Sequence, residues 1–294
     1  MASNEYRRKA IKNILAGTAA LTSTGMLSSF NSGKEMSAQV LKGNINHSVC
    51  RWCFGQLSVE ELSIAAKEIG LKAIDLVGPK DWPTLQKYGL ESSMCNGAEI
   101  NLVNGFNDKQ YHSKLLKNYS DMIPLVAKAG YKNLICFSGN RAGKDDETGL
   151  TNSAEGLKQL MALAEKHKVT LVMELLNSKI DHKDYQCDKT PWGVELVKRV
   201  GSDNFKLLYD IYHMQIDEGD VIRTIKANHQ YIAHYHTAGV PGRHELDEFQ
   251  ELNYLAIMKA IVGTGFKGYV AQEFIPVKAD KLASLRQAVA LCDV

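Results

Sequence analysis

The 294-residue chain has almost no excess charge of either sign. Its 35 Lys and Arg residues stand against 33 Asp and Glu residues, which leaves a formal net charge of +2. Residues 1–38 hold five of the basic residues and only two of the acidic ones, so the rest of the chain carries about −1. Binding to nucleic acid requires a basic patch or groove. The near-neutral body therefore predicts that nucleic acid is not a partner.

Long apolar runs are also missing. After residue 38 no uncharged apolar run approaches the roughly 18 residues that a membrane-spanning helix needs, so we expect no stable membrane insertion. The N-terminal stretch "YRRKAIKNILAGTAALTSTGML" begins with basic residues and continues without acidic ones, and Arg7, Arg8 and Lys12 resemble a twin-arginine export signal. We predict a signal segment over residues 1–38 and a periplasmic location. If this segment is a frayed helix instead, the location is cytoplasmic.

A complete set of zinc-binding cysteines is absent as well. The motif "CRWC" at residues 50–53 has the spacing of a redox or zinc half-site, but no second CxxC motif and no Cys/His pair completes it. Cys95 and Cys136 lie inside apolar, strand-like runs, where a free cysteine behaves as a small hydrophobic residue. We therefore expect the six cysteines to be buried thiols.

After residue 40 the sequence alternates between short apolar runs and amphipathic helical stretches. The strand-like runs are residues 45–49, 73–78, 91–97, 133–139, 170–176, 205–211, 232–238 and 268–274. Eight units of a strand followed by a helix predict a parallel sheet, because parallel strands need helical crossovers. Their number and length favour an α/β fold, a (β/α)8 TIM barrel that forms a single domain over residues 39–294. An open doubly wound sheet is the alternative, but no GxGxxG or GxxxxGK[ST] loop follows any strand.

The helical patterns include residues 58–70, 153–168 and 252–265. Ser58 and Glu61 form a capping box at the start of the first, and Gly70 is placed to end it.

Polar residues interrupt the last four predicted strands close to their C-terminal ends. They are Glu174, Asp210, His236 and Glu273, on strands five to eight in this order. Because TIM-barrel active sites lie at the C-terminal ends of the strands, we expect these side chains to meet at one level. Three converging carboxylates repel one another unless a cation neutralises them. Carboxylate oxygens with one imidazole suit Mn²⁺, Mg²⁺ or Co²⁺ better than Zn²⁺, so the sequence predicts a divalent metal site.

Other interpretations of these positions stay open. A single acid at a strand end is more often a helix N-cap or an ion-pair partner. His234 lies two residues before His236, on the same face of the strand, and could replace it as a ligand.

Further candidates for the pocket lie in loops. Asn96, at the end of the third strand, is a candidate pocket residue, although "NG" is also a turn signal. Trp52 and Phe54 follow the first strand and either form an apolar wall for a sugar or pack under a loop. Asn177 lies in the loop after the fifth strand, where a solvated side chain is the default expectation.

The order Glu, Asp, His, Glu on strands five to eight resembles the xylose isomerase-like superfamily of sugar isomerases and epimerases. The likeness extends over about residues 44–290 and is greatest to the hydroxypyruvate isomerase branch. The motifs that carry it are "ELLNSK" (174–179), "YDIYH" (209–213), "IAHYHTAGVPGRHELD" (232–247), "ELNY" (251–254) and "QEF" (272–274). The stretch "PGRHE" followed by "ELNY" is the most specific part.

This resemblance implies a role for each matching residue. The metal ligands that it implies are Glu174, Asp210, His236 and Glu273. Glu174 and Glu273 would also transfer protons, while His213 and Arg243 would contact substrate oxygens. The chain departs from the hydroxypyruvate isomerase branch at His236, where those enzymes tend to carry Gln and ketose epimerases carry His. The loop "LDEFQELNY" also lacks the glycine that they usually place before the Glu.

The function predicted on these grounds is a metal-dependent isomerase that interconverts the aldehyde and ketone forms of a small hydroxy-keto acid or sugar. A divalent ion acidifies the proton next to the carbonyl, one carboxylate removes that proton, and a second returns it. A ketose 3-epimerase, or a keto-sugar lyase or dehydratase, would use the same site. A non-catalytic sugar-binding module is a further alternative. The expected partner is a small-molecule sugar or keto acid, and a homo-oligomer is compatible with this pattern.

The metal-dependent endonucleases for abasic DNA share the barrel of this superfamily. They need additional metal ligands on earlier strands and a basic groove. His47 and Glu99 are too few for those ligands, and the near-neutral charge argues against the groove.

Overall fold

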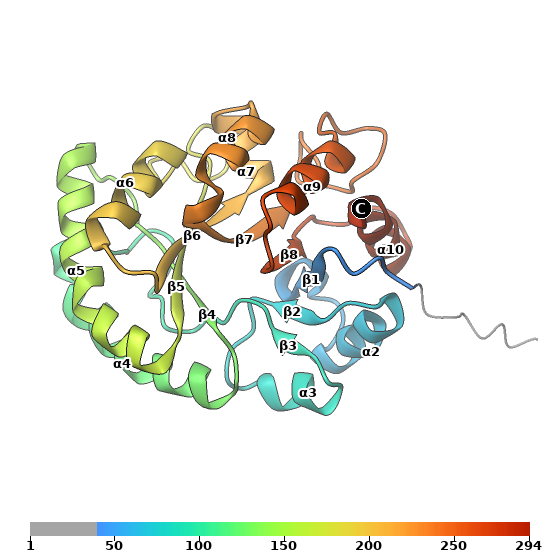
Figure 1. Ribbon diagram of the computed structural model, residues 1–294, viewed down its shortest axis with the longest axis horizontal. Coiled ribbons are helices and arrows are strands. Elements are labelled where there is room, and N and C mark those ends of the chain that lie inside the picture. Colours follow the sequence, from blue (N-terminus) through green and yellow to red (C-terminus); the bar gives the residue numbers. More distant parts are fainter. Residues whose placement is uncertain (1–39) are drawn as a thin grey trace, which may run out of the picture. The chain divides into compact units, whose positions relative to one another are not determined.

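The computed structural model describes residues 40–294, so the predicted signal segment at residues 1–38 lies outside the described residues. Figure 1 shows a central ring of strands surrounded by helices. The strands are β1 (Asn46–Cys50), β2 (Ala73–Asp75), β3 (Glu91–Ser92), β4 (Asn133–Cys136), β5 (Thr170–Leu175), β6 (Phe205–Asp210), β7 (Ile232–Thr237) and β8 (Tyr269–Gln272). All neighbours pair in parallel, in the order β3-β2-β1-β8-β7-β6-β5-β4. A parallel bridge between Cys95 and Leu134 links the chain after β3 to β4 and closes the sheet, which confirms the predicted (β/α)8 barrel.

The helices pack on the outside of the barrel. They are α2 (Val59–Ile69), α3 (Trp82–Lys87), α4 (His112–Lys128), α5 (Asp146–His167), α6 (Thr190–Val200), α7 (Ile211–Asp217), α8 (Val221–Asn228), α9 (Tyr254–Gly263) and α10 (Lys281–Cys292). Three short 3₁₀ turns, η1 (Arg51–Phe54), η2 (Lys109–Tyr111) and η3 (His229–Tyr231), supplement them. In the part of the chain that the structure describes, no helix has the length and apolar character needed to cross a bilayer.

Local capping chemistry explains where the predicted helices begin. The capping box between Ser58 and Glu61 is present in α2, and Gly70 follows that helix in a left-handed conformation, as predicted. Helix α5 begins at Asp146, seven residues before the predicted start, because the Asp145 carboxylate accepts a hydrogen bond from the Thr148 backbone N–H. The residues "DETGLTN" at this start have weak helix propensity, so the pattern of apolar residues did not reveal it.

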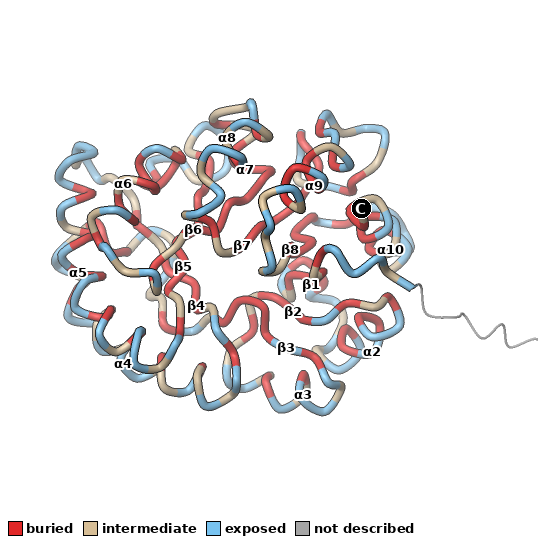
Figure 2. The backbone as a smooth tube through the Cα atoms, viewed as in Figure 1, coloured by how far each residue is buried: buried red, intermediate tan, exposed pale blue. Residues whose placement is uncertain are grey.

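The strands are buried on both faces, as Figure 2 shows for the centre of the molecule. Inside the barrel, Met94, Ile135, Val172 and Leu208 form a small apolar cluster. Val172 and Leu208 lie two residues before Glu174 and Asp210 on β5 and β6, and therefore on the same face of each strand. The interior thus has an apolar layer below and polar side chains at the C-terminal ends of the strands. The six cysteines are buried free thiols, as predicted.

Candidate metal and catalytic site

The structure brings the four predicted ligand residues together. Glu174 comes from β5, Asp210 is the last residue of β6, His236 comes from β7, and Glu273 directly follows β8. All four are buried, and each offers one ligand atom within 4.8 Å of the others. His236 Nδ1 lies 2.7 Å from Glu273 Oε2 and 3.2 Å from Glu174 Oε1. Residues separated by 99 positions in the sequence therefore form one cluster at the C-terminal end of the barrel.

Asp210 takes part in two interactions at once. Its Oδ1 accepts hydrogen bonds from the backbone N–H groups of Tyr212 (2.8 Å) and His213 (3.4 Å), so it caps the short helix α7. Its Oδ2 faces the cluster and lies 3.1 Å from Arg243 Nη2. Asp210 is therefore a helix cap and a member of the cluster at the same time, because its two oxygens contact different partners.

Arg243 and His213, predicted to contact substrate, lie directly against the cluster. The Arg243 guanidinium contacts Asp210 Oδ2 and Glu273 Oε2 through one nitrogen, and its other terminal nitrogen lies 2.7 Å from His213 Nε2. The backbone of Arg243 has a positive φ of 61°. A non-glycine residue adopts this strained conformation only where its surroundings impose it. Arg243 adopts this conformation while its guanidinium contacts Asp210 and Glu273 at the C-terminal end of the barrel.

The electrostatics of the cluster favour an additional cation. Burial raises the pKa of Asp210 to about 7, with the Arg243 guanidinium opposing this rise and Glu273 adding to it. Burial, with repulsion from Glu273, also raises the pKa of Glu174. Burial alone would raise the pKa of Glu273, but His236 and Arg243 hold it well below its usual value. Asp210 and Glu174 therefore hold their protons more readily than ordinary carboxyls, and a cation beside them would stabilise their charged forms.

Trp52 belongs to the site, although the sequence left its role open. Its indole Nε1–H donates to Glu273 Oε1 at 2.8 Å, and its ring lies 5.4 Å from the Arg243 guanidinium carbon. The side chain remains 46% exposed, so it forms part of the open wall of the site. Phe54 is fully buried, which agrees with the alternative that it packs in the interior.

One further expectation is corrected by the structure. Asn177 is fully buried rather than solvated, and its Nδ2 lies 2.6 Å from His213 Nδ1. Asn177 therefore contacts one nitrogen of the His213 ring, while the other nitrogen of that ring faces Arg243. Asn96 is half-buried after the Cys95 bridge, and within residues 40–294 it forms no hydrogen bond with the cluster.

Asp75 is the residue that the sequence reasoning missed. It ends β2, it is fully buried, and its Oδ1 lies 3.0 Å from His236 Nε2. The rule of an acid close to a strand end did not select it, because the predicted strand 73–78 continues for three residues after Asp75, whereas β2 ends there. His234, the alternative ligand, contacts Asp75 and lies outside the four-residue cluster. His47 lies near Asp293, 3.8 Å away, so it adds no ligand to the cluster.

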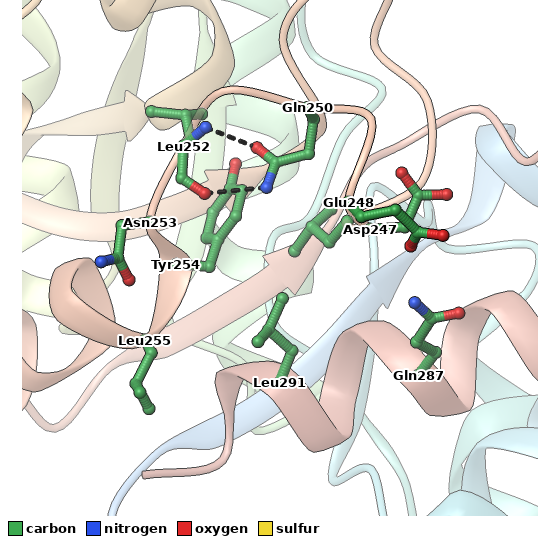
Figure 3. A pocket seen from close by; sticks show the side chains of 10 residues that line it. Asp247, Glu248, Gln250, Leu252, Asn253, Tyr254, Leu255, Gln287 and Leu291 are labelled. Carbon is green, nitrogen blue, oxygen red and sulfur yellow. Dashed lines mark hydrogen bonds between the residues drawn. The ribbon is translucent and has the colours of Figure 1, made fainter.

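A separate pocket of about 450 Å³ lies beside the loop that carries Arg243, between α9 and α10 (Figure 3). Its polar groups are largely engaged within the chain: the Gln250 side chain bonds both the N–H and the C=O of Leu252. The Tyr254 hydroxyl bonds both backbone groups of Ala238. The motif "ELNY" therefore anchors the loop after β7 and adds no group to the cluster.

Comparisons with known proteins agree with the barrel fold. Residues 63–291 match the family model for the xylose isomerase-like TIM barrel. The chain is 37% identical to the 2-oxo-tetronate isomerase of Cupriavidus necator over 108 residues, which is 37% of this chain and 41% of that protein. It is 30% identical to the hydroxypyruvate isomerase of Escherichia coli over 148 residues, or 50% and 57% of the two chains.

The matched stretches thus span about two fifths to three fifths of these curated relatives. A crystal structure of an AP endonuclease, family 2, from Brucella melitensis superposes with a TM-score of 0.73 and 23% identity. The superposition covers 82% of this chain and 97% of that chain. At this identity the superposition establishes the fold alone.

Proposed function

The chain belongs to the xylose isomerase-like TIM barrel family, and from this premise we propose that it is a divalent-metal-dependent isomerase. The reaction is the interconversion of the aldehyde and ketone forms of a small hydroxy-keto acid or sugar. The observation that carries the proposal is the buried cluster of Glu174, Asp210, His236 and Glu273 at the C-terminal end of the barrel. The names of the curated relatives, two isomerases of small keto acids, support the same reaction class.

The donor set of the cluster fits a hard divalent ion. Three carboxylates and one imidazole offer ligand atoms within 4.8 Å of one another, and all four residues are buried. Oxygen-rich sets of this kind suit Mn²⁺, Mg²⁺ or Co²⁺. A bound ion would supply Lewis-acid polarisation of the substrate carbonyl and hydroxyl oxygens.

The side chains around that position have complementary tasks. Glu174 and Glu273 come from β5 and β8, three strands apart, and so approach a bound substrate from different sides. One carboxylate removes the proton next to the carbonyl to form an enediolate, and the other returns a proton at the neighbouring carbon. The Trp52 N–H holds Glu273 at 2.8 Å and orients its carboxylate. Arg243 and His213, adjacent to each other at 2.7 Å, would bind substrate oxygens.

A ketose 3-epimerase, or a keto-sugar lyase or dehydratase, is the second candidate, because the same proton abstraction starts each reaction. The residue that favours it is His236, since the hydroxypyruvate isomerases that this chain resembles tend to carry Gln there. We further propose that residues 1–38 direct export of the folded enzyme, as the paired Arg7 and Arg8 suggest.

The proposal is tested by proton exchange. Mn²⁺-loaded protein is incubated in D₂O with a panel of ketoses, keto acids and keto-glycosides, and deuterium at the carbon next to the carbonyl is followed by NMR. Exchange together with a changed product identifies the reaction class. Glu218→Gln is a matched control, because Glu218 is a half-buried acid that bonds Thr190 away from the cluster. A metal-loaded protein that exchanges no proton on any of these substrates would refute the isomerase, the epimerase and the lyase alike.

A further inference from the structure

Asp75 occupies a place in the barrel that the four-residue cluster does not explain. It lies against His236 on the ring nitrogen that points away from the carboxylates of the cluster. His236 Nε2 is 3.0 Å from Asp75 Oδ1, whereas His236 Nδ1 is 2.7 Å from Glu273 Oε2. A neutral imidazole carries its proton on one nitrogen and offers a lone pair on the other. Both ring nitrogens lie beside a carboxylate. If the carboxylates of Glu174 and Glu273 bind an ion, Asp75 is the carboxylate that accepts the proton of Nε2, and Nδ1 then offers its lone pair to that ion.

The Asp75 carboxylate is itself held in place. Ser93 Oγ donates to Asp75 Oδ2 at 2.6 Å, and the Cys50 thiol donates to Oδ1 at 3.4 Å. His234 Nε2 lies 2.9 Å from Oδ2, in contact but not aligned for a hydrogen bond. Asp75, Ser93, Cys50 and both histidines are buried. A buried carboxylate with this many neighbours has one accessible orientation, so it can fix the plane of a ring that it contacts.

We propose that Asp75 is a positioning residue of the metal centre, which holds His236 in the tautomer and orientation that present Nδ1 to a divalent ion. This inference rests on the proposed function, because it requires that the cluster binds an ion. Carboxylates behind histidine ligands have this role in metalloproteins, and their removal typically costs about 10–100-fold in metal affinity. Asp75 does not touch the cluster except through His236, so its effect is indirect.

A different role for Asp75 would be as a ligand of a second ion. Asp75, His234 and His236 also offer ligand atoms within 4.8 Å of one another. Positioning agrees better with the contacts, because the two Asp75 oxygens already accept hydrogen bonds from Cys50 and Ser93. The number of ions bound per chain distinguishes the two roles.

The test uses the full chain loaded with Zn²⁺, which is diamagnetic and permits NMR. Zinc affinity and stoichiometry are measured by calorimetry for the wild type and for Asp75→Asn, and the histidine ring nitrogens are followed by ¹⁵N-edited NMR. We expect one ion per wild-type chain, with zinc on Nδ1 and a hydrogen-bonded proton on Nε2 of His236. We expect Asp75→Asn to weaken zinc binding by about 10–100-fold and to shift that proton resonance.

Asp293→Asn is the matched control. Asp293 is also a buried carboxylate beside a buried histidine, His47, at 3.8 Å, but it contacts no residue of the cluster. This variant should leave the affinity for zinc and the His236 signals unchanged. If Asp75→Asn does not fold, Ser93→Ala removes one donor from Asp75 without touching His236 and should weaken binding in the same direction.

Several outcomes would overturn the proposal. Undiminished zinc affinity in Asp75→Asn, with one ion bound to the wild type, would refute the positioning role and leave the metal site intact. The loss of one of two ions would make Asp75 a ligand. The spectrum of the wild type is a test by itself: a proton on Nδ1 of His236 and zinc on Nε2 would also refute the positioning role. A wild-type chain that binds no divalent ion would overturn both this inference and the proposed function.

Discussion

Replacing Glu273 by Gln tests the chemistry of the site most directly. The substitution keeps an oxygen and nearly the same volume, but it removes a negative charge that contacts Trp52, His236 and Arg243 together. An amide can still accept from the Trp52 N–H. Its NH₂ group would then face His236 Nδ1 and the Arg243 guanidinium, where the wild type has a carboxylate oxygen. The variant therefore retains part of the metal site but lacks a basic group.

The expected effect can be stated from these contacts. One acid–base group contributes typically about 10²–10⁴-fold to turnover, so Glu273→Gln should lower the rate of deuterium exchange by this factor. Metal affinity should fall by a smaller factor than the exchange rate, because Glu174, Asp210 and His236 still offer their ligand atoms. Exchange is measured at saturating Mn²⁺, so that weaker metal binding does not count as lost catalysis. Near-normal exchange in the metal-loaded variant would show that Glu273 is a ligand only, and the mechanism with two carboxylates would be wrong.

Three further predictions concern the metal, the pH dependence and the N-terminus. In Asp210→Asn the amide oxygen keeps the Oδ1 contacts with the Tyr212 and His213 N–H groups, so an NH₂ group replaces Oδ2 at the cluster. This variant should lose tight Mn²⁺ binding in calorimetry while circular dichroism shows an intact fold; undiminished affinity would contradict the assignment. Burial lowers the pKa of His47 from 6.5 to about 4, so the folded state binds fewer protons than the unfolded state between these values, and stability should fall as the pH falls from 6.5 to 4. In His47→Gln the free energy of unfolding should fall by roughly 3 kcal/mol less than in the wild type between pH 6.5 and pH 4. Denaturant unfolding at several pH values measures this difference, and an unchanged pH profile would show that His47 does not cause the loss of stability. N-terminal sequencing of protein from the native cell should show that about 38 residues have been removed; an intact Met1 or Ala2 in the cytoplasmic fraction would exclude a signal.

The convergence of the four ligand candidates could be predicted because the position of a residue within a strand follows from the sequence pattern alone. Glu174, Asp210 and His236 lie at or near the ends of regular apolar runs, and Glu273 directly follows one. In a parallel barrel every strand end lies on the same face, so equal positions in the sequence become neighbours in space. The error at the start of α5 has the opposite cause: a single side-chain cap at Asp145 moved the start by seven residues without changing the pattern of apolar positions.

The sequence by itself determined the barrel, the buried cysteines and the convergence of the four polar residues, because these follow from strand order and apolar periodicity. Only the tertiary structure decided how the neighbours of this cluster are arranged. Asp75 reaches His236 across the barrel interior, although β1 and β8 lie between β2 and β7 in the sheet. Arg243 reaches Glu273 from a loop whose path depends on the Tyr254 anchor and a left-handed backbone. Such contacts depend on side-chain direction and loop geometry, which a one-dimensional pattern does not encode.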